Sequence, residues 1–179
     1  MAAFRFNRTK WIALAAVILI TAVAVWFFYF RKDDAAIVRA RLREAAALVE
    51  KQPENAIQSL SLAHTLSGFF TEDADIFLSG EADRTFVHST SGRNAIESAY
   101  AASRPMAVSL TIRMSEIGVT FDDDARETAT VKCAALATGS VQDGGDFGER
   151  RLISAKMVRE SDGKWRFRSL RAEPVDTGD

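Results

Sequence analysis

The sequence is poor in the residue types that build disulfide frameworks and metal centres. Its single cysteine, Cys133, excludes an intrachain disulfide and any zinc site made of several cysteines. The two histidines, His64 and His88, are far apart, so soft metal ligands are scarce. The acidic run at 122–124 lacks the alternating ligands and the glycine of a calcium loop. We therefore expect neither a metal nor a cofactor.

The sequence also has no large excess of charge of either sign. The net charge is −1, so no global field favours nucleic acid, and we expect no nucleic-acid partner. A phosphate-binding glycine loop, a nucleophile elbow and a zinc-protease helix are all missing from the sequence. What is present is 47% apolar residues in a length of 179, enough for the core of one ordinary domain.

Residues 11–30 form one uncharged apolar run. Twenty helical residues span about 30 Å, the hydrocarbon thickness of a bilayer. Trp11 stands at one end, and Trp26 and Tyr29 stand at the other, as in the aromatic belts of membrane helices. The alternative is a signal peptide cleaved after residues 22–24, where Ala22 and Ala24 form a small-x-small pattern, and cleavage there would leave an apolar new N-terminus. We predict a single-pass membrane anchor at 11–30, preceded by a tail at 1–10.

The flanking charges leave two orientations open. Arg5, Arg8 and Lys10 precede the run, and six basic residues follow it between positions 31 and 51. Counting alone favours a cytoplasmic C-terminal part. A short tail with three positive charges is nevertheless difficult to translocate, so we predict that the tail stays inside. The domain at 31–174 is then extracytoplasmic, with a cytoplasmic domain as the alternative and a short tail at 175–179.

Periodicity divides the domain into helices followed by strands. Apolar spacing and caps predict a juxtamembrane helix at 33–51, with Asp33 or Asp34 as its cap, and further helices at 53–68 and 91–105. Short strands are expected at 75–80 and 85–90. Four long strands are expected at 106–121, 127–138, 148–159 and 164–172. Because short turns join the long strands, they should form an antiparallel meander.

The first long strand changes phase. Its residues, "MAVSLTIRMSEIGVTF", alternate from Met106 to Met114 and then resume one position out of step at Ile117. An extra residue near Ser115 and Glu116 would form a β-bulge, which bends a strand. The last strand repeats the slip at Leu170. We therefore predict an α+β fold in which helices pack on a strongly curved antiparallel sheet of four or more strands.

Residues 35–172 resemble the nuclear transport factor 2-like superfamily, and are most similar to SnoaL-like domains with a cystatin-like α+β cone. The resemblance rests on the order of elements, on Gly92 and Ile96 in the helix before the sheet, and on "DGKWRF" at 162–167. It implies a curved sheet closed by helices around a pocket. The superfamily includes isomerases, dehydratases and cyclases as well as domains that only bind.

Alternation assigns side chains to the inner face of the sheet. The predicted pocket residues are Met106, Val108, Leu110, Ile112, Val131, Cys133, Trp165 and Phe167. The inner positions contain no carboxylate, histidine or tyrosine, so these strands offer no general acid or base. Candidates elsewhere are His64, on an apolar helix face, Asp75 and Tyr100. A core histidine, a turn aspartate and a core tyrosine are the simpler interpretations.

The outer positions carry five cations: Arg113, Lys132, Lys156, Arg166 and Arg168. A half-solvated sheet is expected to be polar, but the face could also dock an acidic partner or lipid headgroups. We predict a membrane-anchored binding or assembly module without catalytic activity, with a protein partner or a second copy. The alternatives are a SnoaL-like enzyme that uses His64 with an aspartate, and a carrier of a small hydrophobic ligand.

Overall fold

The computed structural model describes residues 19, 21, 33–51, 56–79, 89–142 and 144–175. The chain divides into two compact units, Met1–Ala36 and Ile37–Asp179. In the first unit, Leu19 and Thr21 are helical. Asp33 accepts a hydrogen bond from the Ala35 amide over 3.1 Å, which confirms the predicted helix cap.

None of the helices in the described part of the chain is both long and apolar enough to cross a bilayer. The predicted anchor at 11–30 lies outside the described residues, apart from Leu19 and Thr21. The anchor therefore stays a prediction.

The helices and strands follow the predicted order. The helices are α2 (Asp34–Val49), α3 (Ala56–Ser67) and α4 (Arg93–Ser103), and the 3-10 turn η2 (Arg104–Met106) follows α4. The strands are β1 (Phe70–Leu78), β2 (Ser89–Ser91), β3 (Ala107–Phe121), β4 (Thr128–Val141), β5 (Gly145–Arg159) and β6 (Trp165–Pro174). The four long strands match their predicted ranges closely.

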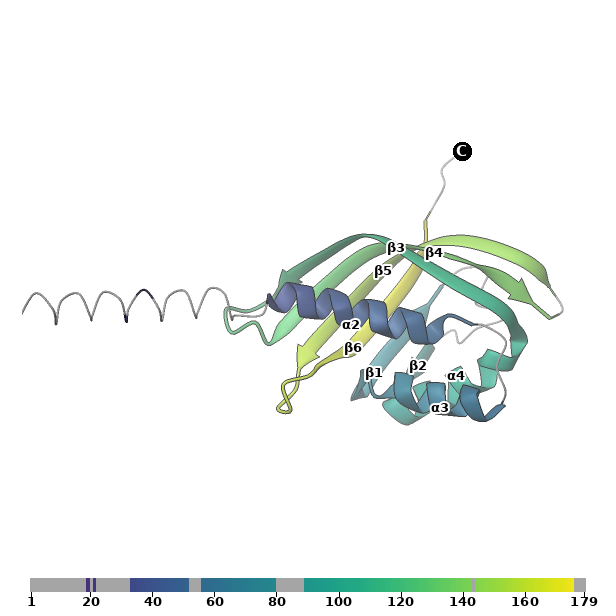
Figure 1. The fold of residues 1–179 in the computed structure, drawn as a ribbon, viewed down its shortest axis with the longest axis horizontal. Helices are drawn as coiled ribbons and strands as arrows, with labels where there is room; N and C mark the ends of the chain where they lie inside the picture. Colours follow the sequence, from purple (N-terminus) through teal and green to yellow (C-terminus); the bar gives the residue numbers. More distant parts are fainter. Residues whose placement is uncertain are drawn as a thin grey trace, which may run out of the picture. The chain divides into compact units, whose positions relative to one another are not determined.

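The sheet has the spatial order β2-β1-β6-β5-β4-β3 (Figure 1). Strands β3 to β6 pair antiparallel with their sequence neighbours, which confirms the predicted meander. The sheet is not wholly antiparallel, however, because β1 runs parallel to β6, with Ile76 opposite Leu170. The length of a loop predicts pairing only between consecutive strands. The pairing of β1 with β6, which comes last in the sequence, could not be predicted in this way.

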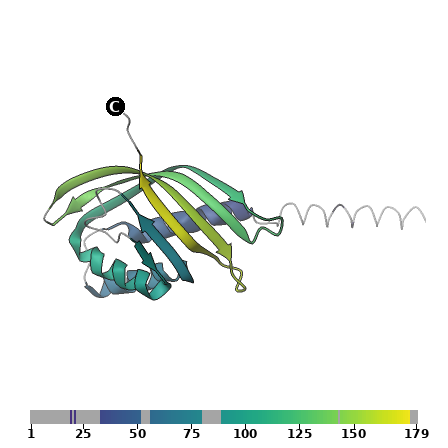
Figure 2. The same cartoon turned by 180° about the vertical axis from the view of Figure 1, so that it is seen from behind.

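Two bulges bend the sheet where the phase slips predict them. In β3 the register shifts between Ser115 and Gly118, and Glu116 adopts a φ of 57°. In β6, Phe167 faces Met157 and Ser169 faces Lys156, so Arg168 is the extra residue. The strands curl around α2, which lies on their concave side in the views from front and back (Figures 1 and 2). This confirms the curved α+β architecture.

The core forms where α2 meets the concave face of the sheet. Val38 and Leu42 of α2 belong to the same buried cluster as Met157 and Phe167 of the sheet. Phe167 is fully buried, and its ring lies 5.4 Å from that of Phe70 in β1. These contacts hold the helix against one part of the concave face.

Candidate ligand-binding cavity

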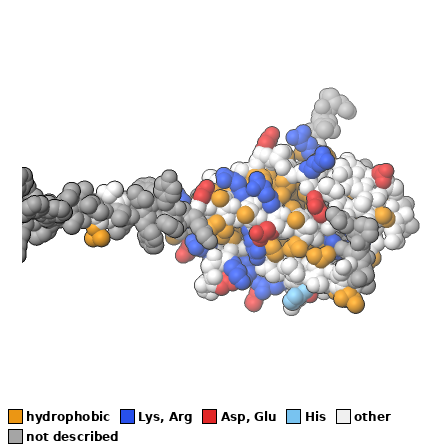
Figure 3. Space-filling view, viewed as in Figure 1, with side chains coloured by type: hydrophobic (Ala, Val, Ile, Leu, Met, Phe, Trp, Pro, Cys, Tyr) orange, Lys and Arg blue, Asp and Glu red, His pale blue; other side chains and the backbone are white. Residues whose placement is uncertain are grey.

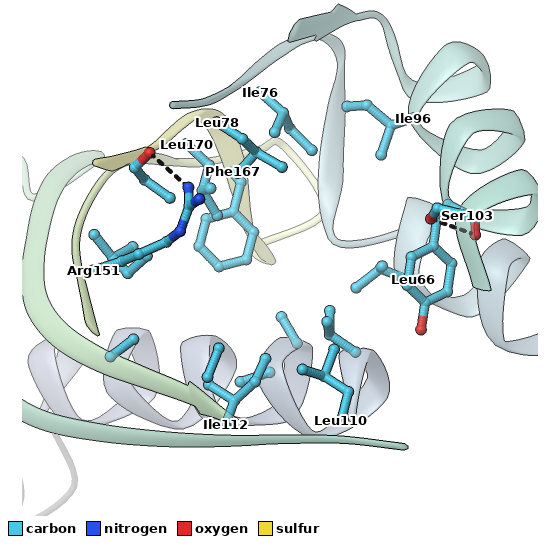
Figure 4. Close-up of a pocket in the computed structure, with 18 of the residues that line it drawn as sticks. Leu66, Ile76, Leu78, Ile96, Ser103, Leu110, Ile112, Arg151, Phe167 and Leu170 are labelled. Atoms are coloured by element: carbon cyan, nitrogen blue, oxygen red, sulfur yellow. Dashed lines mark hydrogen bonds between the residues drawn. The ribbon is translucent and has the colours of Figure 1, made fainter. Parts of the chain in front are cut away.

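A cavity of about 300 Å³ occupies the part of the concave face that the core does not fill. All six described strands and the helices α2, α3 and α4 contribute to its wall. Its walls are mainly apolar, with side chains that include Leu66, Ile76, Ile96, Leu110, Ile112 and Phe167 (Figure 4). The volume is roughly twice that of the apolar cavity of roughly 150 Å³ that holds a benzene molecule. An apolar molecule of bicyclic size would fit.

Few ionisable side chains reach this cavity. Those that line it are Lys51, Tyr100, Arg104 and Arg151. Among the described lining residues there is no aspartate, glutamate, histidine or cysteine. The wall therefore lacks the residue types that most often act as general bases.

Arg104 secures the end of α2 at one side of the cavity. Its side chain donates to the carbonyl oxygens of Leu48 over 3.2 Å and Glu50 over 3.0 Å. Arg104 also donates to the Tyr100 hydroxyl, which in turn donates to Leu48 O over 2.6 Å. The last carbonyls of a helix have no partner within the helix and carry its negative dipole end. The hydrogen bonds of Arg104 and Tyr100 therefore stabilise the cavity wall at the C-terminal end of α2.

Arg151 lies on the opposite side of the cavity from Ser103 (Figure 4). It is 9% exposed, and its Nη2 lies 3.0 Å from Oε1 of Glu149, two positions earlier on β5. Its Nη1 donates to Ala172 O on β6 over 3.3 Å. Neither Glu149 nor Arg151 was predicted from the sequence as a residue of the inner face. Extending the alternation of Ile153 and Ala155 by two and four positions towards the N-terminus would have placed them on the inner face.

The structure does not bring the predicted catalytic candidates together. The His64 side chain is 81% exposed, and its Nδ1 lies 3.3 Å from Oε1 of Glu97 on α4. Asp75 is exposed on β1 and accepts a hydrogen bond from Ser91. Of the three candidates, only Tyr100 lines the cavity. We find no shared site for His64, Asp75 and Tyr100.

The prediction that His64 lies on a buried face of its helix is wrong. Ile57 and Leu60, which share that face, are 80% and 62% exposed. Helix α3 instead buries Ala63 and Leu66. The helix therefore has apolar residues on two faces, and it buries the face that carries Ala63 and Leu66.

The eight predicted pocket residues divide into three groups. Leu110, Ile112 and Phe167 line the cavity, while Val131, Cys133 and Trp165 are buried in the core and are not among the lining residues. The prediction is wrong for Met106 and Val108, which are each 50% exposed. Met106 belongs to the 3-10 turn, and Val108 lies in a register shift between Ala107 and Ser109. That extra bulge turns both side chains away from the cavity.

The five predicted cations do not form a uniform positive face. Lys156 lies 3.5 Å from Asp122, and Arg168 lies 3.5 Å from Asp73. Arg166 contacts Glu160 and Asp162, whereas Arg113 and Lys132 are simply exposed. Basic and acidic side chains are also interspersed on the face shown in Figure 3. Neighbouring carboxylates therefore offset much of the positive charge.

Nothing in the described ranges resembles a metal centre. Across these residues, no group of three or more histidine, cysteine, aspartate or glutamate side chains is placed to hold an ion.

A curved sheet that closes with helices around an apolar cavity defines the nuclear transport factor 2-like class of α+β domains. Residues 58–171, more than half of the chain, match the family model described as a SnoaL-like domain, and the chain belongs to this family. No curated protein matches the chain by sequence.

Solved structures share the fold at low sequence identity. One is a nuclear transport factor 2-like protein with a cystatin-like fold from Novosphingobium aromaticivorans, with 17% identity, a TM-score of 0.62, and coverage of 88% of this chain and 91% of that chain. Another is the hexachlorocyclohexane dehydrochlorinase LinA-type3 from Novosphingobium barchaimii, with 13% identity, a TM-score of 0.62, and coverage of 83% and 94%. A third is Aln2 from a Streptomyces species, with 17% identity, a TM-score of 0.57, and coverage of 80% and 91%.

Proposed function

We propose that the domain is a non-catalytic binding module whose cavity takes a small, mainly apolar molecule, and that residues 11–30 tether it to a membrane. The observation that carries the proposal is the composition of the cavity wall. Apolar side chains from the sheet and three helices line a volume of about 300 Å³. Ligand sites of this size are typically apolar with a few placed polar groups.

The ionisable groups at the cavity favour binding over catalysis. A guanidinium keeps its proton in proteins, so Arg104 and Arg151 cannot act as bases. The Glu149 carboxylate is held by Arg151, and the Tyr100 hydroxyl donates to Leu48 O. General acid–base catalysis needs a group that exchanges a proton with the substrate. The described wall supplies Lys51 and Tyr100 for such a role, and both are hydrogen-bonded to backbone carbonyls.

A cavity-filling variant tests binding. Ala135 on β4 lines the cavity, so Ala135→Phe should occupy part of the volume. Naphthalene should bind to the full chain, and Ala135→Phe should weaken its binding by about tenfold or more, because even one methylene is felt in a packed site. Leu136→Phe is the matched control, since Leu136 is 40% exposed. Ligand-observed NMR would give both dissociation constants, and equal binding to both variants would contradict the proposal.

A second candidate is an enzyme, and fold similarity to the LinA-type3 dehydrochlorinase favours it. In that case Tyr100 is the side chain of the wall best suited to proton transfer. Incubating the full chain with hexachlorocyclohexane and measuring chloride release tests this alternative directly. Chloride release that falls in Tyr100→Phe, while naphthalene still binds, would favour the enzyme over the binding module.

The tether has its own test. Full-length protein should stay in the membrane pellet after alkaline carbonate extraction. The double substitution Leu19→Arg and Val23→Arg should release it, because each central charge costs about 3 kcal/mol on insertion scales. A reporter at the C-terminus that is active in only one compartment should report an extracytoplasmic domain. Activity in the cytoplasm would instead establish the opposite orientation.

A further inference from the structure

One buried charged residue, Arg151, interrupts the apolar wall of the cavity, and its partner Glu149 lies two positions away on β5. Glu149 and Arg151 both point inward from β5, since their strand partners are Ala137 and Ala135, which line the cavity. Burying a charged group is costly unless it is paired and hydrogen-bonded. Here the guanidinium has both kinds of partner, in Glu149 at 3.0 Å and in Ala172 O at 3.3 Å.

Arg151 supplies a strong hydrogen-bond donor to this wall. A guanidinium carries five N–H groups in a rigid fork and is always charged. Arg151 lines the cavity beside Phe167, and the labelled side chains around them are apolar (Figure 4). An acceptor atom on a bound molecule would meet this donor where the arginine itself is only 9% exposed. Charge-assisted hydrogen bonds of that kind are about twice as strong as neutral ones.

The charge of this donor is already balanced. Glu149 contacts the same nitrogen, Nη2, through both of its oxygens, at 3.0 and 3.1 Å. A carboxylate or phosphate ligand would therefore bring a second negative group to a guanidinium that already has one. The ligand anion and the Glu149 carboxylate would then bind the same guanidinium and repel each other. A neutral acceptor such as a carbonyl oxygen would gain the hydrogen bond without this repulsion.

From this geometry we infer that the cavity selects uncharged apolar molecules with one carbonyl-type acceptor, which Arg151 orients, and rejects the corresponding carboxylates. This inference rests on the proposed function, because it requires that the cavity binds a ligand. It adds to the proposed function a class of ligand, a polar contact between Arg151 and the ligand, and a role for Glu149. Glu149 acts as a positioning residue that holds the guanidinium and neutralises it.

Three probes with the same number of non-hydrogen atoms test this selectivity on the full chain: 2-isopropylnaphthalene, 2-acetylnaphthalene and 2-naphthoate. They differ only in an apolar, a neutral acceptor or an anionic substituent. The ketone should bind about tenfold or more tightly than the hydrocarbon, the range of a hydrogen bond to a charged group. The carboxylate should bind more weakly than the ketone. Ligand-observed NMR gives the three dissociation constants.

Variants assign the selectivity to the charged pair. Arg151→Met should reduce the ketone to the affinity of the hydrocarbon and leave hydrocarbon binding within about threefold. Arg150→Met, on the exposed neighbouring position, should keep the wild-type preference. Glu149→Gln removes the balancing charge but keeps Arg151, so it should make the carboxylate bind more tightly than the ketone.

The outcomes separate the two proposals. Equal binding of ketone and hydrocarbon to the wild type, or tighter binding of the carboxylate, would overturn the selectivity while leaving a ligand-binding cavity in place. A ketone preference that survives in Arg151→Met would overturn the role of Arg151. Failure of all three probes to bind to the wild type would overturn the proposed function as well.

Discussion

Arg104 donates to the carbonyl oxygen of Leu48 over 3.2 Å and so joins the turn after α4 to the last turn of α2. The arginine is 4% exposed. A buried guanidinium at a helix C-terminus satisfies carbonyls that have no partner within the helix. This contact fixes the position of two elements that line the cavity.

Replacing Arg104 should therefore destabilise the domain. In Arg104→Met, the carbonyls of Leu48 and Glu50 lose a buried donor, and we expect a loss of about 2–4 kcal/mol in the free energy of unfolding. Urea denaturation followed by circular dichroism measures the change. Arg113→Met, at an exposed position on the outer face, is the control and should stay within about 0.5 kcal/mol of the wild type. Equal effects of the two substitutions would contradict the role given to Arg104.

Gly139 allows close approach of β3 and β4. A Cβ atom at this position would collide with the Ser109 carbonyl oxygen and lie 3.1 Å from the Leu110 Cα. Since the obstacle is backbone, Gly139→Ala should cost about 1–3 kcal/mol. Gly148→Ala would place its Cβ 3.8 Å from the Thr138 side chain, an ordinary contact, and should be neutral or slightly stabilising. Thermal unfolding of both variants should show a loss only at Gly139.

Asp162 gives the turn between β5 and β6 a pH dependence. A hydrogen bond from Arg166 is the main cause that lowers the pKa of Asp162 from 3.8 to about 2. The depressed folded-state pKa means that the ionised form stabilises the fold above pH 3.8, and that this stabilisation is lost as the pH falls towards 2. Wild type should thus unfold at a higher temperature than Asp162→Asn at pH 6, and the difference should be much smaller at pH 2 and continue to shrink below it. A difference as large at pH 2 as at pH 6 would exclude ionisation of Asp162 as its source.

Cys133 should react only slowly with thiol reagents in the folded protein. Its side chain is 4% exposed, and burial raises the pKa of the thiol. Because the thiolate is the reactive form, iodoacetamide at pH 7.5 should modify the chain only slowly. Adding urea should increase the labelling, as read by intact mass, since this is the only cysteine. Rapid labelling without urea would show that the strand opens readily.

Local patterns in the sequence were sufficient to predict the curvature of the sheet. The phase slips near Glu116 and before Leu170 correspond to register shifts in β3 and β6. Such slips can be read because each strand alternates apolar and polar residues on both sides of the bulge. The shift at Val108 could not be read in this way, because Met106, Val108 and Leu110 keep an unbroken apolar alternation.

The cavity was predictable as an apolar space but not in its polar detail. Leu110, Ile112 and Phe167 follow from alternation, whereas Arg151 breaks the expectation that an inner position is apolar. Its burial depends on Glu149 and on a carbonyl from β6, and only the folded register brings these partners together. The prediction for His64 was wrong for a related reason. Contacts with other elements of the fold decide which apolar face of α3 is buried, and the local sequence does not show these contacts.

The parallel pairing of β1 with β6 also governs when the domain can form. Thr71 and Phe167, which meet in this pairing, are 96 positions apart in the chain. Contacts between such distant segments are slow to form, since the intervening chain must first be ordered. During synthesis β1 emerges early and must wait for the final strand to leave the ribosome. Until then β1 has only β2 as a strand neighbour, and its other edge stays open to wrong pairings.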